Sequence, residues 1–304
     1  MSPRVLVLTP MKNATKHLDR YFSNLAGLDY ETSDLSLGFL VSDSDDGTYG
    51  ALEERLPDLR EQYARVTLTS HDFGLRIPEG IERWSPAFQI PRRVVLARSR
   101  NRLLFAALRD EDWVLWMDVD LDAYPPTVLD ELLASGKSIV HPHCVVKPGA
   151  RSFDGNTWRD GGATTLHELR GRPAVRIEGV GGTMLLVRAD IHRDGLIFPS
   201  YPYGTRSPFV RDHNPMMGRL GGEIETEGLA VMAKDMGHEV WGLPDLEVVH
   251  RSASRRYGIG LAEPSQVARH HCRLRESDCR HERRSTPQGF VRPRSPYPDR
   301  RMDW

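Results

Sequence analysis

Trp113-Val-Leu-Trp-Met-Asp-Val-Asp120 is the stretch that decides the fold, because an apolar run ends there in two carboxylates one residue apart. The run from Val114 to Met117 is typical of a buried central strand in an α/β sheet. Ligands of open α/β sheets collect outside the carboxyl ends of the strands, so we expect Asp118 and Asp120 to lie at such an end, on the same side. Paired carboxylate oxygens suit Mg²⁺ or Mn²⁺ bound with water and a substrate diphosphate; the alternative is a polar strand end without a metal.

Outward from this stretch, expected strands and helices alternate in the pattern of a largely parallel α/β sheet. The other expected strands cover residues 5–8, 35–42, 65–69 and 138–146. The expected helices cover residues 14–28, 50–62, 92–109, 125–133 and 223–236. Long loops are expected over 78–91, 147–172 and 199–222, a strand–turn–strand unit over 175–187, and a strand pair around Pro244 over 239–249.

The formal net charge of −1 hides an asymmetry between the body of the chain and its C-terminal tail. Residues 251–304 hold thirteen arginines against six acidic residues, so residues 1–250 carry a net negative charge. We expect a folded domain over 1–250, made of halves 1–146 and 147–250, followed by a basic extension. The extension either contacts a polyanion such as nucleic acid, contacts an anionic membrane surface, or folds back on the acidic body.

Length and composition are those of an ordinary globular protein of 304 residues. No apolar run reaches the 18 residues of a transmembrane helix, and Val5–Leu8 is too short for the core of a signal peptide. We therefore expect a soluble, cytoplasmic protein. Cys144, Cys272 and Cys279 form neither a disulfide framework nor a standard zinc pattern.

Two further features place phosphate-binding groups near the carboxylates. Thr9-Pro10-Met11 ends the first expected strand, and backbone groups at such an exit commonly contact a nucleotide. Six arginines occur from Arg92 to Arg109, and Arg98 and Arg102 share a helix face because they are four residues apart. Arginine forks bind diphosphate in a bidentate way, so we expect one or two of them, including Arg98, to act there and the rest to be solvated.

Two more features add acidic and imidazole groups. Glu223, Glu225 and Glu227 open a helix after two glycines. They either only complement the helix dipole or place a carboxylate beside a sugar, where it orients an acceptor hydroxyl or stabilises positive charge. His250 follows the last expected strand, where it either completes a metal site or is a plain surface or core residue.

Taken together, the segments from Val5 to about His250 resemble glycosyltransferase family 62, the fungal mannan-polymerase α-mannosyltransferases. The Asp-X-Asp pair is itself a signature of nucleotide-sugar glycosyltransferases. The segments that carry the resemblance are Val5-Leu-Val-Leu-Thr-Pro-Met11, Leu96-Ala-Arg98, Arg100-Asn101-Arg-Leu-Leu-Phe105, Trp113 to Asp120, Glu178-Gly-Val-Gly-Gly-Thr183, Ile191-His-Arg-Asp-Gly195, Phe198-Pro199, Ile224-Glu-Thr-Glu-Gly228, Met232-Ala-Lys234, Val240-Trp-Gly-Leu-Pro244 and Val249-His250.

The resemblance implies a GT-A fold, in which a nucleotide-sugar-binding half (1–146) is joined to an acceptor-side half (147–250). It implies a GDP-mannose donor, Mn²⁺ (or Mg²⁺), and retention of configuration. Carried over to this chain, the metal ligands are Asp118, Asp120 and His250, with Asp118 also in a catalytic role. The donor-binding residues are Thr9, Pro10, Met11, Ser42, Asp43, Arg98, Asn101, Arg102 and Asp118, and Glu225 or Glu227 is the carboxylate near the acceptor.

The chain also departs from that family. Its fungal members are Golgi enzymes with an N-terminal membrane helix that work in multiprotein complexes, whereas this sequence shows no such helix. The sequence predicts a soluble, metal-dependent, retaining mannosyltransferase acting on a glycan, lipid-linked or polyanionic acceptor. The alternatives are another nucleotide sugar transferred to nucleic acid or another polyanion, a non-catalytic nucleotide- or sugar-binding module, and a metal-dependent nucleotidyltransferase or hydrolase.

Overall fold

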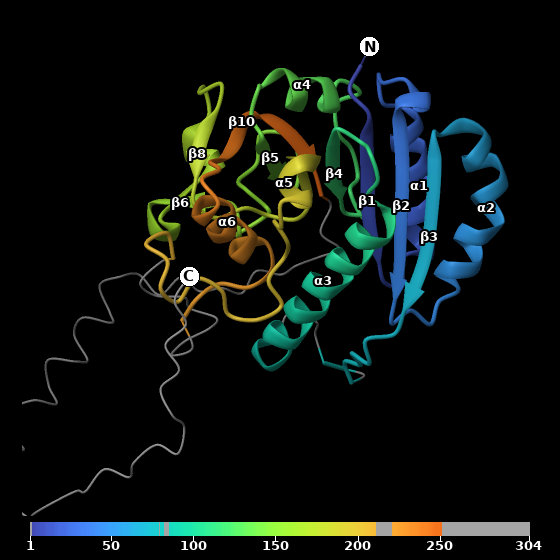
Figure 1. Cartoon of the computed structure of the whole chain (residues 1–304), viewed down its shortest axis with the longest axis horizontal. Helices are drawn as coiled ribbons and strands as arrows, with labels where there is room; N and C mark the ends of the chain where they lie inside the picture. Colours follow the sequence, from blue (N-terminus) through green and yellow to red (C-terminus); the bar gives the residue numbers. More distant parts are fainter. Residues whose placement is uncertain (1, 79, 82–84, 211–220, 251–304) are drawn as a thin grey trace, which may run out of the picture. The chain divides into compact units, whose positions relative to one another are not determined.

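An eight-stranded sheet forms the centre of the computed structural model, which describes residues 2–78, 80–81, 85–210 and 221–250 (Figure 1). The strand order is β3-β2-β1-β4-β9-β5-β10-β8. The strands are β1 (Val5–Met11), β2 (Leu35–Ser42), β3 (Arg65–His71), β4 (Trp113–Met117), β5 (Ile139–Val145), β8 (Val175–Ile177), β9 (Met184–Arg188) and β10 (Val240–Val249). Two short strands, β6 (Trp158–Arg159) and β7 (Thr164–Thr165), form a separate hairpin.

The strand directions bring several strand ends to one edge of the sheet. β3, β2, β1 and β4 are parallel neighbours, and β10 is parallel to β5. β9 lies antiparallel between β4 and β5, so β5 and β10 run in the direction of β4. The carboxyl ends of β1, β2, β4, β5 and β10 therefore share an edge, which is where ligands of such sheets bind.

Helices cover both faces of the sheet because its strands are apolar on both sides. One face packs against α1 (Thr15–Ala26), α2 (Thr48–Gln62) and α4 (Val128–Ala134). The other packs against α3 (Pro86–Ala107), α5 (Ala189–Arg193) and α6 (Glu225–Asp235). Alternate residues of β1 separate accordingly: Val5 and Val7 join the first core, and Leu6 and Leu8 join the second.

The predicted α/β class with a mostly parallel sheet is confirmed, and the strand over 35–42 has the expected bounds. The predicted loop over 78–91 was wrong in its second part, because α3 begins at Pro86, as helix first turns tolerate proline. The loop predicted over 147–172 contains the β6–β7 hairpin and the 3₁₀ turns η2 (Asp160–Gly162) and η3 (Leu166–Leu169). A third such turn, η1 (Thr32–Asp34), precedes β2.

The last predicted strand pair is one strand. β10 runs through Pro244, and its pairing with β5 shifts register between Leu243 and Glu247. The shift allows a proline inside the ladder, since proline cannot donate a backbone hydrogen bond there. Within the part of the chain that the structure describes, no helix is long and apolar enough to cross a membrane. The predicted basic extension lies outside the described residues.

Candidate functional site at the carboxyl edge of the sheet

Asp118 and Asp120 follow β4 at the shared edge of the sheet. The Asp118 backbone N–H donates to the carbonyl oxygen of Thr183, 2.9 Å away, which fixes the chain as it leaves the strand. The two carboxylates stay partly open, with 32% of the Asp118 side chain and 25% of the Asp120 side chain exposed. Both can therefore contact a ligand at this edge.

His250, which follows β10, meets Asp120 across the sheet edge. Its Nε2 lies 3.1 Å from Asp120 Oδ1, and its ring stacks on Phe153 with centroids 4.1 Å apart. Burial lowers the pKa of His250, but the hydrogen bond to Asp120 and the charge of Asp118 more than offset this, so the pKa is raised. The parallel course of β4, β5 and β10 thus unites residues more than a hundred positions apart.

Arg100 of α3 stands between Asp118 and the start of α6. Its Nη2 lies 3.6 Å from Asp118 Oδ1, and its Nη1 pairs with Glu225. The guanidinium is buried and lies over the ring of Phe198, 5.2 Å from its centroid. Burial raises the pKa of Asp118 to about 6, with Arg100 opposing and Asp120 adding to the rise.

Glu225 and Glu227, at the start of α6, are enclosed by cations. Arg93 Nε lies 3.1 Å from Glu225 Oε2, and Arg93 Nη1 lies 2.7 Å from Glu227 Oε2. Trp158 Nε1 donates to the other Glu227 oxygen at 3.1 Å. Each glutamate side chain is only 5% exposed. Burial alone would raise the pKa of Glu225, but Arg100 and Arg93 hold it below its ordinary value.

Glu225 has a backbone φ of 60°, in the left-handed region that costs a residue with a Cβ about 1–2 kcal/mol. Its backbone N–H donates to the carbonyl of Pro199 at 2.8 Å, and Arg93 also donates to the carbonyl of Ile224 at 2.9 Å. These contacts hold the strained start of α6 against α3.

Asp154, in the loop after β5, is a carboxylate near Asp118 that no sequence pattern singled out. Its Oδ2 accepts from Thr183 Oγ1 at 3.1 Å and lies 3.9 Å from His141 Nε2, and the side chain is 11% exposed. A Cβ at Gly181 would lie 1.7 Å from this oxygen, and one at Gly182 would lie 2.2 Å from Arg100 Nη2. The two glycines thus make room for both charged groups.

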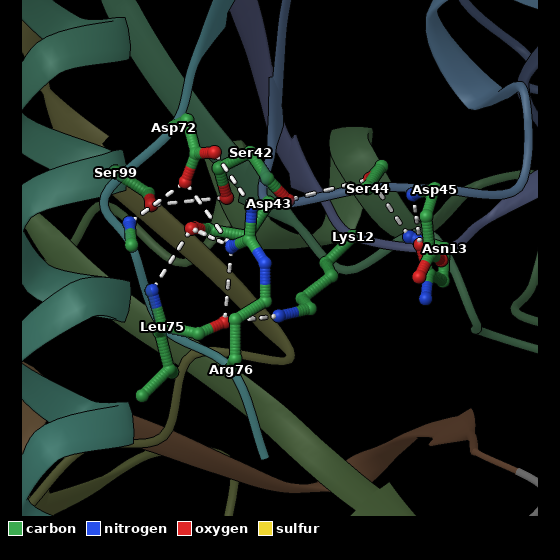
Figure 2. Close-up of polar contacts among 11 residues, drawn as sticks. Lys12, Asn13, Ser42, Asp43, Ser44, Asp45, Asp72, Leu75, Arg76 and Ser99 are labelled. Atoms are coloured by element: carbon green, nitrogen blue, oxygen red, sulfur yellow. Dashed lines mark hydrogen bonds and ion pairs between the residues drawn. The ribbon is translucent and has the colours of Figure 1, made fainter. Parts of the chain in front are cut away.

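The loops after β1, β2 and β3 are joined by a polar network on the expected nucleotide side (Figure 2). Asp43 has a buried side chain and accepts hydrogen bonds from the Leu75 N–H at 3.1 Å and from Arg76 Nη1 at 3.0 Å. Lys12 Nζ donates to the carbonyl of Leu75 at 3.0 Å, and Ser42 Oγ lies 3.5 Å from Ser99 Oγ. Asp43 Oδ2 has no hydrogen-bond partner in the described part of the chain.

The remaining predicted donor-binding residues fall in different places. The Thr9 side chain is buried and bonds to Tyr21 Oη at 2.8 Å, and Met11 is also buried, while Pro10 is partly exposed. Asn101 bonds to the backbone of Phe198 at 2.7 and 2.9 Å. Arg98 and Arg102 are exposed and line a surface hollow with Phe105. The structure thus brings Arg93 and Arg100, rather than Arg98 and Arg102, to the carboxylates.

The residue types at the edge fit a divalent cation, because two carboxylates and an imidazole are ligands that Mn²⁺ accepts. Among the described residues, however, no three His, Cys, Asp or Glu side chains are spaced as they would be around a metal ion. Asp120 and His250 pair directly with each other. The negative charges of Asp120 and Asp154, which help to raise the pKa of Asp118, are the kind of repulsion that a bound cation relieves.

The mostly parallel sheet, with acidic residues at the end of a central strand, places this chain in the GT-A class of glycosyltransferase folds. A solved structure with a similar fold is the mannosyltransferase PcManGT from Pyrobaculum calidifontis in complex with GDP-Man and Mn²⁺. The TM-score is 0.52 with 19% sequence identity, and the match covers 85% of this chain and 59% of that one. The predicted fold class is confirmed.

The chain belongs to the Anp1 family, whose sequence pattern matches residues 1–172 and 163–202. It is 31% identical to the mannan polymerase II complex anp1 subunit of Schizosaccharomyces pombe, over 81% of this chain and 64% of that protein. It is 30% identical to the mannan polymerase complex subunit MNN9 of Candida albicans, over 81% of this chain and 74% of that one. The resemblance to glycosyltransferase family 62 is confirmed, and the chain spans less than two thirds of the first relative's length.

Proposed function

We propose that this chain is a metal-dependent, retaining mannosyltransferase that moves mannose from GDP-mannose to a hydroxyl acceptor. The observation that carries the proposal is the meeting of Asp118, Asp120 and His250 at the carboxyl edge of the sheet. The names of the relatives, mannan polymerase complex subunits, support the choice of mannose. The donor and Mn²⁺ in the name of the structural neighbour agree with the same reading.

In this proposal Asp118, Asp120 and His250 would hold the cation. A bound cation would act as a Lewis acid that stabilises the negative charge on the departing nucleoside diphosphate. Arg100 holds Asp118 in place and is a further positive charge beside the site. Ser42, Asp43 and the end of β1 would line the nucleotide, and the buried Asp43 carboxylate holds the loop after β3 through Leu75 and Arg76.

The carboxylate nearest the sugar has three candidates. The sequence predicts Glu225 or Glu227, and this stays a prediction; both are buried and paired with arginines. We assign that place to Asp154 instead, because it shares the bridging Thr183 with Asp118 and is less enclosed. A carboxylate there stabilises the positive charge that develops on the sugar ring during transfer.

The acceptor and the setting belong to the proposal as well. The relatives' names make an α-mannoside the first acceptor to test, and they suggest that this chain also works with protein partners. A nucleic-acid or other polyanionic acceptor through the basic extension, and a cytoplasmic location, stay predictions.

The test is transfer itself. The protein is incubated with GDP-mannose, Mn²⁺ and methyl α-mannoside, and mass spectrometry follows disaccharide, free mannose and GDP. Disaccharide formed only with metal supports the proposal. Free mannose alone would indicate a hydrolase, and transfer from UDP-glucose in preference would discard mannose. If short DNA or RNA binds in a salt-dependent manner and becomes glycosylated, the polyanionic alternative replaces the α-mannoside.

A further inference from the structure

A cavity lies away from the carboxylates, at the C-terminal end of α6. Its volume is about 680 Å³, within the range of small-molecule sites. Its lining includes Arg159, Arg176, Lys234, Glu178, Glu239 and Phe209. The lining contains charged side chains of both signs beside apolar ones, so it suits neither a purely apolar ligand nor a simple anion. A ligand rich in hydroxyl groups, which donate and accept, meets both kinds of side chain.

The groups in the cavity have unused binding capacity. Lys234, in the last turn of α6, makes no hydrogen bond or ion pair with the residues that the structure describes. Burial lowers its pKa, with Glu178 and Glu239 opposing. Arg176 approaches Glu239 only to 3.8 Å. Phe209 is 45% exposed and supplies an apolar ring of the type on which sugar rings stack.

Rigid elements connect this cavity to the carboxylate edge. α6 begins at Glu225, beside Arg100, and reaches Lys234 nine residues later, a rise of about 14 Å. In β6, Trp158 bonds to Glu227, while its neighbour Arg159 lines the cavity. The cavity therefore lies about 14 Å along α6 from Glu225, beside β8, which is at the opposite end of the sheet from β3.

We propose that this cavity is a remote subsite for a neutral oligosaccharide, which holds the far end of the acceptor glycan while its other end reaches the carboxylate edge. This inference rests on the proposed function for the identity of the glycan. Phe209 would stack on a sugar ring, and Lys234, Arg159 and Glu178 would bond to its hydroxyl groups. Long acceptors then bind more tightly than short ones, and the gain depends on residues that do not touch the donor.

The experiment measures binding of α-linked mannotetraose and of methyl α-mannoside by calorimetry, with Mn²⁺ and GDP present. We expect Phe209→Ala and Lys234→Met to weaken mannotetraose binding at least tenfold and to leave methyl α-mannoside and GDP unchanged. The matched control is Phe105→Ala, which removes an exposed ring from α3. Equal mannotetraose affinity in all variants, or no mannotetraose binding by the wild-type protein, overturns the subsite.

These outcomes separate the subsite from the proposed function. GDP-mannose and Mn²⁺ binding, measured in the same variants, reports on the donor site alone. If mannotetraose binds through Phe209 but no mannose is transferred, the subsite stands and the proposed function fails. If mannose is transferred with no preference for longer acceptors, the proposed function stands and the subsite is wrong. A third outcome is that inorganic phosphate binds more tightly than mannotetraose and that Lys234→Met abolishes phosphate binding. The cavity would then be an anion site, and the glycan subsite would be wrong.

Discussion

Asp118-Val-Asp120 and Glu225-Thr-Glu227 show the same pattern, two carboxylates separated by one residue, and the structure uses them in opposite ways. The aspartates leave a strand at the open edge of the sheet and keep a quarter to a third of their side chains exposed. The glutamates begin a helix and are 5% exposed, with Arg93, Arg100 and Trp158 as partners.

The difference shows that the hydrogen-bond and ion-pair partners of a carboxylate determine whether it can bind a ligand. A buried carboxylate whose oxygens are paired is committed to holding elements together, because removing its partner leaves an uncompensated charge. An open pair at a strand end has lone pairs to offer to a cation. Arg100 contacts Asp118 of the first pair and Glu225 of the second, so a movement of the start of α6 would also move Asp118.

The largest effect is expected for Asp120→Ala. The substitution removes a proposed metal ligand and the partner of His250, so transfer should fall by roughly a thousandfold or more, about 4 kcal/mol. Circular dichroism and the melting temperature should change little, because the side chain is at an open edge. A folded Asp120→Ala enzyme with wild-type transfer would remove the metal role from this pair.

The second prediction concerns the enclosed pair. Glu225→Gln leaves the buried Arg93 and Arg100 short of a counter-charge, and breaking a buried pair typically costs 3–5 kcal/mol. We expect a loss of about 3 kcal/mol in the free energy of unfolding by urea. Glu61→Gln, at an exposed position of α2, is the matched control. Equal stabilities of the two variants would mean that the glutamate pair is not structural.

The third prediction tests the packing under the open pair. Trp116 Nε1 donates to His192 Nε2 at 3.2 Å, and His192 Nδ1 bonds to the carbonyl of Leu196 at 2.7 Å. Burial lowers the pKa of His192 to about 4. The unfolded chain therefore takes up the proton first as the pH falls. The contribution of neutral, buried His192 to the free energy of unfolding is complete above about pH 6.5. It declines by roughly 3 kcal/mol toward pH 4.

Urea unfolding between pH 7 and pH 4 measures this decline. His192→Gln keeps a polar side chain but cannot titrate, so its stability should depend less steeply on pH in that window. Identical slopes for His192→Gln and the wild-type protein would assign the acid sensitivity to other groups.

The fourth prediction concerns the space beside Asp118. A methyl group at Gly181 would overlap Asp154 Oδ2 and lie 2.9 Å from His141 Nε2, so Asp154 must move. We expect Gly181→Ala to lower transfer about tenfold and stability by about 1–3 kcal/mol. Gly155→Ala is the control, since its Cβ would meet nothing within 4 Å. Equal activities in the two variants would exclude Asp154 from a role beside the sugar.

The smallest effect separates two arginines of α3. Arg98 is exposed and Arg100 is buried between the two carboxylate pairs. Lysine cannot reproduce the fork of arginine, so Arg100→Lys should lower transfer by about tenfold. Arg98→Lys should lower it less than about twofold. The reverse order would restore the sequence-based expectation that Arg98 holds the diphosphate.

The sequence predicted that Asp118, Asp120 and His250 lie at strand ends, because strand ends have a local signature. Asp118 and Asp120 follow an apolar run, and His250 follows another strand of the same sheet, so parallel topology alone brings them to one edge. The prediction needed no knowledge of side-chain packing. Whether these three residues bind a metal stays a prediction.

The buried network was harder to predict, although one signal was present. Arg93 and Arg100 are seven residues apart, on the same helical stripe as the buried Ala97 and Leu104. An arginine on a buried stripe requires an acidic partner, and that pattern points to Arg93 and Arg100 rather than to Arg98. Asp154 had no such signal, because its loop has no periodicity and its place depends on the glycines after β8.

The central claim is that the open aspartate pair binds a nucleoside diphosphate together with a cation. The most direct measurement is the melting temperature of the wild-type protein and of Asp120→Ala with GDP, with and without Mn²⁺, since a ligand specific to the native state raises stability by mass action. We predict that GDP stabilises the wild-type protein only when Mn²⁺ is present, and does not stabilise Asp120→Ala. Equal stabilisation of both proteins, or stabilisation of neither while both are folded, would contradict the claim.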